Sequence, residues 1–216
     1  MLLQKGADVN AQAGPFGSAL QVASRQGKEK IVAMLLEKGA DVNAQGGLFG
    51  NALQAASRKG EEKIVAMLLE KGADVNAQGG FYGSALHVAL GQEEEKIVAM
   101  LLEKGADVNA QGGPYGSALQ TALLVGKEKI IAMLLEKGAD VNAQGGPFGS
   151  ALQAAFLQGQ VKIVAMLLEK GADVNAQGGP VAVDRPHSVC HNLSNFALLT
   201  TTFFVGVFIL IFYYSF

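Results

Sequence analysis

The sequence predicts an all-α protein, an α-solenoid in which every repeat is a helix–turn–helix followed by a hairpin loop. The first observation is an unbroken period: the hexapeptide Ala-Asp-Val-Asn-Ala-Gln begins at Ala7 and recurs every 33 residues as far as Ala172. The second is that each unit holds two short segments with the apolar spacing of helices. The third is the glycine that follows nearly every such segment. Helices this short are marginal alone, so stacked units are expected to bury their apolar faces against one another.

One unit can be followed from Ser18, a residue suited to capping the first turn of a helix. The segment after it has the spacing of a short first helix, which Gly27 ends. A second helix is expected over residues 28–38, because apolar side chains recur on one face and charged residues lie at both ends. Gly39 occupies the left-handed position that commonly terminates a helix, and the glycine-rich residues 40–50 form an extended, turning connector.

The turn between the two helices differs in the third unit, where Glu93 stands in place of glycine. Glycines in register indicate a positive φ, which a residue with a Cβ adopts at a cost of about 1 kcal/mol. We therefore expect the third unit to be the local weak point of the array. In the alternative, Gly91 lets the first helix end sooner and the turn form differently. The glycines in register are Gly27, Gly60, Gly126 and Gly159.

The unit resembles the ankyrin repeat, whose signature contains Gly-x-Thr-Pro-Leu-His-x-Ala, then Ile-Val-x-Leu-Leu, then Gly-Ala-Asp-Val-Asn-Ala. The last two parts stand almost unchanged in this chain, and the resemblance covers residues 1 to about 180. The first part departs, because the family's threonine–histidine pair is mostly a Ser–Gln pair here, as in Ser18-Ala19-Leu20-Gln21. Glutamine can still donate and accept hydrogen bonds in that place. His87 stands where the family's motif histidine belongs, so its expected role is structural.

The resemblance implies a non-enzymatic protein–protein interaction module. The variant Gly-Gly-x-aromatic-Gly-Ser/Asn-Ala-Leu-Gln also resembles the repeats that filamentous fungi append to large NACHT-type nucleotide-switch proteins. On that resemblance, the chain is a fragment of a larger fungal signalling protein, and any catalytic domain lies outside it.

The repeat pattern divides the chain into four parts. Residues 1–12 are expected to be a partial leading repeat, because the first six residues match residues 34–39. Residues 13–180 hold five repeats and the start of a sixth hairpin. No polar capping face is visible at the opening, which favours a fragment or a mis-started version of a longer protein over a short standalone array. Residues 181–195 read as a polar linker, and residues 196–216 as a hydrophobic segment.

The hydrophobic segment is a candidate C-terminal helix. Its 21 residues carry no charge and would span about 30 Å as a helix, enough for a bilayer core. With no secretory signal ahead of it, the segment would be a transmembrane tail anchor, and the array a membrane-tethered scaffold facing the cytosol. The single Cys190 fits such a reducing compartment. The alternatives are a translated intron or frame error and a buried terminal helix.

Charge and motifs argue against catalysis and nucleic-acid binding. The chain has 17 basic and 19 acidic residues, so its net charge of −2 offers no field to attract phosphate backbones. Loops such as Gly145–Ser150 lack the lysine of a phosphate-binding loop. The spacing of His187, Cys190 and His191 matches no closed metal site. We expect no catalytic residue, no metal and no cofactor.

Partner information is expected where the otherwise similar units differ most, at the end of the first helix. This stretch passes from basic and polar in the first two units to apolar in the last two, and exposed apolar patches usually mark contact sites. In the alternative, Leu90, Leu123 and Phe156 only pack between adjacent units. The candidate partner-binding residues are Arg25, Gln26, Arg58, Lys59, Gln92, Leu124, Val125, Leu157 and Gln158.

A row of aromatic residues in the hairpins is the second feature with two interpretations. Because the row is almost invariant between units, a structural role in the extended hairpin segments is favoured. In the alternative, the row is a second contact stripe. Its members are Phe16, Phe49, Tyr82, Tyr115 and Phe148.

Overall fold

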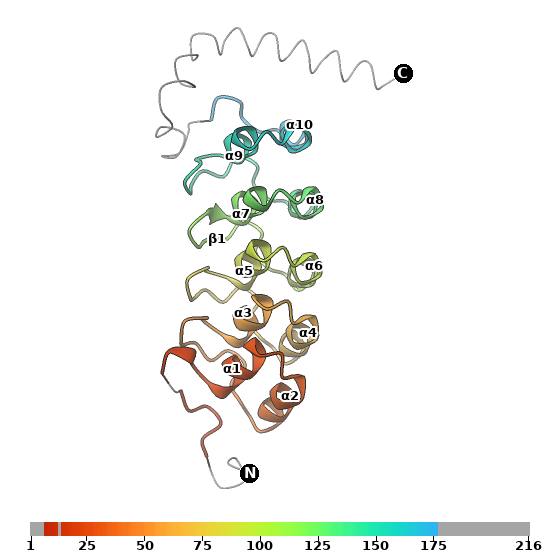
Figure 1. The fold of residues 1–216 in the computed structure, drawn as a ribbon. Helices are drawn as coiled ribbons and strands as arrows, with labels where there is room; N and C mark the ends of the chain where they lie inside the picture. Colours follow the sequence, from red (N-terminus) through yellow and green to blue (C-terminus); the bar gives the residue numbers. More distant parts are fainter. Residues whose placement is uncertain (1–6, 13, 177–216) are drawn as a thin grey trace. The chain divides into compact units, whose positions relative to one another are not determined.

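The described part of the chain is a stack of helix pairs. The computed structural model describes residues 7–12 and 14–176. The chain divides into two units, Met1–Gly179 and Pro180–Phe216, and every described residue belongs to the first. The paired helices confirm the predicted helical repeat array (Figure 1). The predicted linker and hydrophobic segment, together with residues 1–6, lie outside the described residues.

The first helices of the units form one row, and the second helices form another row beside it (Figure 1). The first helices are α1 (Ala19–Arg25), α3 (Ala52–Ser57), α5 (Ala85–Gly91), α7 (Ala118–Val125) and α9 (Ala151–Leu157). The second helices are α2 (Glu29–Glu37), α4 (Glu62–Glu70), α6 (Glu95–Glu103), α8 (Glu128–Glu136) and α10 (Val161–Glu169). A short 3-10 turn, η2 (Gly14–Phe16), precedes α1.

Sequence and structure agree on how the helices begin and end. The Ser18 side chain caps α1 by accepting from the backbone N–H of Gln21, the role predicted for a serine at this position. The second helix expected over residues 28–38 is observed as Glu29–Glu37, with Lys28 and Lys38 as its capping residues. The segments between the units are short hairpins, and in one of them β1 (Gln111–Gly112) pairs antiparallel with β2 (Gly116–Ser117).

The core runs between the two rows of helices. Second-helix side chains such as Ile64 and Leu101 are 0% exposed, because each helix is covered by the helices of the neighbouring units. The first helices contribute Leu53, Leu86 and Leu119, each at most 2% exposed. Burial of these apolar side chains on both rows joins neighbouring units, as expected for a solenoid.

A polar side chain on each first helix also crosses to the next unit, and it is buried on α1, α3, α5 and α7. Gln54 is 2% exposed, and its Nε2 donates to carbonyl oxygens of the following hairpin, among them Gly83 at 2.6 Å. His87 replaces this glutamine in the third unit, and its Nε2 lies 3.2 Å from the carbonyl oxygen of Gly116. Because a carbonyl can only accept, Nε2 carries the proton and Nδ1 accepts from the Ser84 hydroxyl at 2.8 Å. The predicted structural role of His87 agrees with this geometry.

The turn at Glu93 has the backbone that its neighbours predict. Glu93 has a φ of 63°, close to the 69° of Gly27 and the 70° of Gly60. Helix α5 runs to Gly91 and Gln92 caps it, as Gln26 caps α1 one residue after its end. The alternative, in which Gly91 ends the helix sooner, is therefore wrong, because α5 ends at the same place as α1 and the turn keeps its positive φ with a residue that carries a Cβ.

Replacing Glu93 by glycine is expected to stabilise the array. Glycine adopts this φ without strain, and the gain is reduced by the greater freedom of glycine in the unfolded chain, leaving roughly 0.3–1 kcal/mol. The ion pair lost with Glu93, to Lys127 Nζ at 3.0 Å, is exposed and contributes little. Urea unfolding of the full chain measures the change. The Glu93→Ala variant loses the same ion pair but keeps the strained φ, so it should not stabilise. A neutral or destabilising Glu93→Gly would show that the strain is absent.

His87 predicts a pH dependence of stability. Burial lowers the pKa of His87 below its usual value, although the hydrogen bond to the Gly116 carbonyl acts in the opposite direction. The folded array therefore holds the neutral ring. Stability is fully present above the unfolded pKa of about 6.5 and is lost as the pH falls from there toward the folded pKa.

Lowering the pH from about 7.5 to 5.5 should then reduce the free energy of unfolding by up to about 1.4 kcal/mol for each unit below 6.5. The matched control is His87→Gln, because Gln54 and Gln120 fill the same position in neighbouring units. The two other histidines of the chain are common to both proteins. Equal pH slopes in the two proteins would contradict the assignment.

Candidate protein-binding surface

The candidate partner-binding residues all lie where the first helices end. Arg25 and Leu157 are the last residues of α1 and α9, and Arg58 caps α3. Since these positions are equivalent in stacked units, the residues follow one side of the array. We call this set the helix-end stripe: Arg25, Gln26, Arg58, Lys59, Gln92, Leu124, Val125, Leu157 and Gln158. Each of these side chains is exposed or half-buried.

The two arginines of the stripe stack on the aromatic rings of the hairpins. The Arg25 guanidinium lies 4.5 Å from the centroid of the Phe49 ring and 6.0 Å from that of Phe16. The Arg58 guanidinium lies 5.5 Å from the Phe49 centroid and 5.4 Å from that of Tyr82. Cations at such distances are attracted by the ring faces. The arginines of the helix-end stripe and the aromatic row of the hairpins therefore form one surface, in which rings and guanidinium groups alternate.

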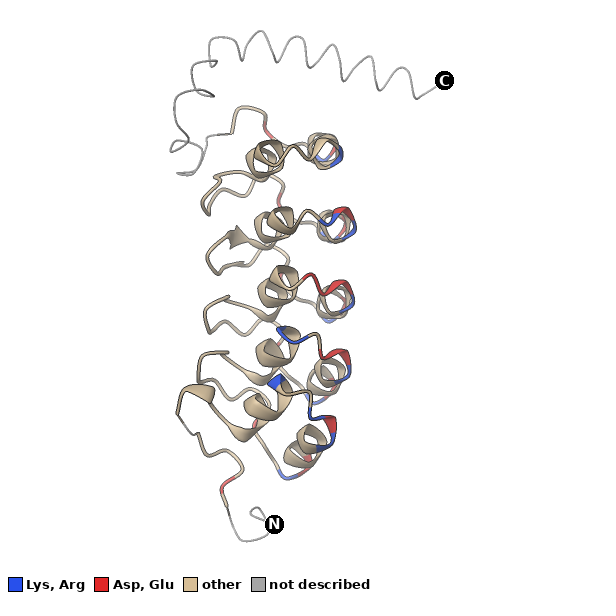
Figure 2. Ribbon diagram, in the orientation of Figure 1, with Lys and Arg blue, Asp and Glu red and all other residues tan. Residues whose placement is uncertain are grey.

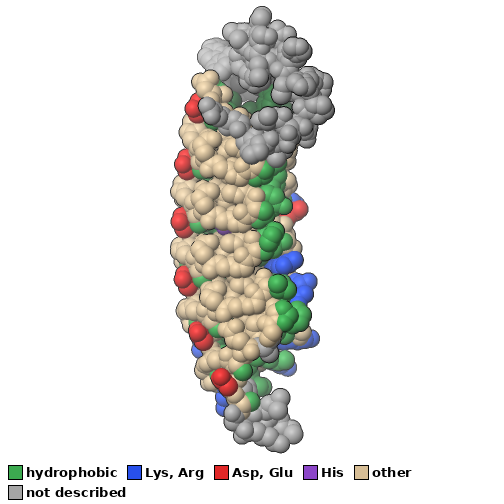
Figure 3. Space-filling model, turned by 90° about the vertical axis from the view of Figure 1, so that its left-hand side faces the viewer, with side chains coloured by type: hydrophobic (Ala, Val, Ile, Leu, Met, Phe, Trp, Pro, Cys, Tyr) green, Lys and Arg blue, Asp and Glu red, His purple; other side chains and the backbone are tan. Residues whose placement is uncertain are grey.

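The aromatic row is both structural and accessible. Phe148 packs against the core, whereas Phe16 and Tyr115 are 49% and 39% exposed. Figure 3 views the array from the side of the hairpins. It shows hydrophobic side chains gathered along one edge, with basic side chains next to them over the lower part of the array. The two interpretations of the row are compatible, because a ring can pack one edge on its hairpin and leave a face to stack with arginine.

Two exposed apolar residues beside the aromatic row were not predicted from the sequence. Leu48 is 64% exposed and Phe81 is 70% exposed, each directly before an aromatic of the row. Phe81 also meets the ring of Tyr82 edge-on at 5.1 Å between centroids. The sequence does distinguish these two residues, because the equivalent position in later units holds proline, at Pro114 and Pro147.

The packing alternative is correct for two residues and wrong for the third. Leu90 and Leu123 are 0% exposed, so they belong to the core between units. Phe156, at the equivalent position of α9, is 55% exposed. The adjacent Leu124 and Leu157 are half-buried.

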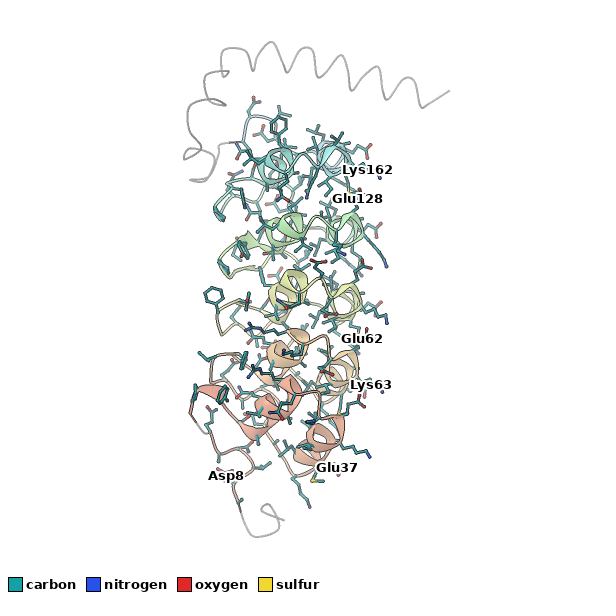
Figure 4. The ribbon with its side chains drawn as sticks, in the orientation of Figure 1. Asp8, Glu37, Glu62, Lys63, Glu128 and Lys162 are labelled. Carbon is teal, nitrogen blue, oxygen red and sulfur yellow. The ribbon has the colours of Figure 1, made fainter. Side chains whose placement is uncertain are left out.

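Acidic and basic residues of the second helices are paired along the array. Lys129 Nζ lies 2.8 Å from Glu95 Oε2, and this hydrogen bond lowers the pKa of Glu95 below its usual value. The equivalent pair of Glu128 and Lys162, labelled in Figure 4, joins α8 to α10 at 3.6 Å. Exposed pairs of this kind contribute little stability singly. The charges of each pair cancel, so these pairs add no net charge to the surface of the second helices.

Over residues 7–12 and 14–176, no three histidine, cysteine, aspartate or glutamate side chains come together as metal ligands would. The sequence around His187, Cys190 and His191 lies outside these residues. Over the same described ranges, no helix has both the length and the apolar character needed to cross a membrane.

Comparison with protein families agrees with the architecture. The family model described as ankyrin repeats, in three copies, matches residues 1–79, 49–112, 79–145 and 115–178. These overlapping matches together cover most of the chain, and the chain belongs to the ankyrin-repeat family. The module that this model describes is non-catalytic, and tandem ankyrin repeats are typically protein–protein interaction modules. A comparison with curated proteins gave no match.

Proposed function

We propose that the array binds a partner protein on the helix-end stripe and the aromatic row beside it, and that it does so without enzymatic activity. The observation that carries the proposal is where the units differ. Residues with buried roles repeat almost unchanged, such as the capping serines and the leucines that follow them. The ends of the first helices change from unit to unit while they remain exposed or half-buried. Variation at accessible positions along one strip suits recognition, because these positions can change without disturbing the stack.

A photo-crosslinking residue tests which side of the array meets the partner. We choose Gln26, Gln92 and Gln158, which are exposed and cap first helices. The matched controls are Lys38, Lys71 and Lys104, which are exposed and cap second helices. In extract of the cells that make the protein, the full chain should give crosslinked protein bands from the first set and not from the second. Equal bands from both sets, or bands from the controls alone, would contradict the proposed surface.

The larger context remains a proposal that rests on the sequence. The resemblance of the repeat variant supports a fungal signalling protein, in which this array is the repeat portion of a NACHT-type nucleotide switch whose catalytic domain lies outside the chain. The uncharged residues 196–216 support a second function, a membrane-tethered ankyrin scaffold with its array in the cytosol.

The membrane alternative predicts the behaviour of a simple fusion. A cytosolic carrier protein that ends in residues 181–216 should pellet with membranes and resist carbonate extraction, because about 30 Å of apolar helix would span the bilayer core. The control ends in residues 181–195 and should stay in the supernatant. Recovery of the longer fusion in the soluble fraction would contradict the anchor and leave the interaction module unaffected.

A further inference from the structure

The helix-end stripe changes its chemistry along the array. In the first two units the position at the end of the first helix holds Arg25 and Arg58, and in the last two it holds Leu124 and Leu157. Figure 2 shows the basic residues at the ends of α1 and α3, and acidic residues at the turn before α6. One surface thus has a cationic end and an apolar end, in a fixed order along the stack.

The cationic end is held ready for an anion. Arg25 and Arg58 are half-buried, and each guanidinium group lies within 6.0 Å of the centroids of two hairpin rings. Among the described residues, neither arginine forms an ion pair, and the guanidinium N–H groups of both donate no hydrogen bond. The carboxylates of Glu61 and Glu94 lie against the nearby turn glycines Gly27 and Gly60, and neither of them forms an ion pair with these arginines. A guanidinium fork with free N–H edges matches the geometry of a carboxylate.

The middle of the stripe separates the two ends. Gly91 leaves the third unit without a side chain at the equivalent position, and its Cα has open space around it. Glu93 follows two residues later, is exposed, and is paired with Lys127 Nζ at 3.0 Å. A second carboxylate would not be attracted to this neutralised pair. Acidic residues of a ligand are therefore favoured over the first two units only.

The other end of the stripe, over the last two units, is apolar. Leu124 and Val125 end α7 and are half-buried, as is Leu157 at the end of α9. Apolar side chains that remain partly accessible gain free energy when a partner covers them. Val161, which replaces the glutamate of the other second helices, is 69% exposed and extends the apolar character of the last unit.

We infer that the array recognises an extended segment of its partner whose acidic side chains lie on Arg25 and Arg58 and whose apolar side chains lie on Leu124 and Leu157. The inference rests on the proposed function, since it names the chemistry of the same surface. Charge complementarity selects the acidic part. The stripe holds two neighbouring positions in each unit and follows one side of the stack, which suits a single extended chain.

The spacing of the units sets the spacing of the ligand. Packed helices lie about 8–10 Å apart, and an extended chain rises about 3.3 Å per residue, so one unit corresponds to about three ligand residues. Two acidic residues should therefore be about three positions apart. Two apolar residues with the same separation should follow about six positions beyond them, across the third unit. Either chain direction satisfies this order.

A random library of displayed peptides, each about 16 residues long, tests the inference on the immobilised full chain. Enriched peptides should carry the acidic pair and the apolar pair at these separations. A peptide from that pool, labelled for fluorescence anisotropy, should lose affinity about tenfold or more on the double variant Arg25→Gln/Arg58→Gln, because charge-assisted hydrogen bonds are removed. The charge-matched control Lys71→Gln/Lys104→Gln removes two positive charges at the far end of the second helices and should bind as the parent does. Circular dichroism checks that both variants keep their helices.

The variant Arg25→Lys/Arg58→Lys separates charge from geometry. It keeps both positive charges but lacks the planar fork, so it should retain only part of the affinity. Enrichment of basic or wholly apolar peptides, no enrichment over beads without the chain, or equal binding by the Arg→Gln variant would each overturn the inference. The proposed function is judged separately, because crosslinks confined to Gln26, Gln92 and Gln158 would still identify the stripe as the contact surface.

Discussion

The array depends on a buried side chain that reaches from each first helix into the loop of the next unit. Gln21 is 1% exposed, and its Nε2 donates to three carbonyl oxygens of the following hairpin. Its Oε1 accepts from the backbone N–H of the capping Ser18, so both ends of the amide are used. A buried amide without these partners would cost about 1–3 kcal/mol, and the hairpin carbonyls would lose their donor as well. Helix and following hairpin are therefore stable only together, which couples neighbouring units more tightly than apolar contact alone.

The same contact positions the candidate surface. It fixes the hairpin of each unit against the preceding helix, and the hairpin carries the aromatic ring that stacks on that helix's arginine, as Phe49 does on Arg25. A second ladder at the opposite end of the hairpins works alongside it: Asn43 accepts from the Asp74 backbone N–H at 2.8 Å and donates to the Gly72 carbonyl at 3.1 Å. With both ends of each loop held, the order of rings and guanidinium groups follows from the stacking itself.

The sequence predicted those features that depend on neighbours along the chain. The period, the two helices of a unit, the serine caps and the positive φ of Glu93 follow from local patterns, and all four agree with the structure. Contacts between units were not predictable in this way. The stacking of Arg58 between Phe49 and Tyr82 joins rings 33 residues apart, and no local signal sets the lateral register of hairpin and helix. Which side chains of a helix end face the next unit is likewise a property of the stack. Sequence alone therefore left Leu90 and Leu123 among the alternatives, although they are 0% exposed.

The third unit differs from the others both in its buried contacts and at the helix-end stripe. Among the five described units, it has a buried histidine, His87, at the position that glutamine fills in the others. Its turn holds a non-glycine residue, Glu93, at a φ that favours glycine. Both departures lie beside Gly91, the position at which the stripe has no side chain. Backbone strain persists only where surrounding contacts hold it, and here the packed helix pair of the unit does so. A glycine at the turn would make the array more stable but would remove the partner of Lys127, and with it the neutral pair that separates the cationic end of the stripe from its apolar end. The cost in stability is thus linked to the order of charges along the surface, because one side chain determines both.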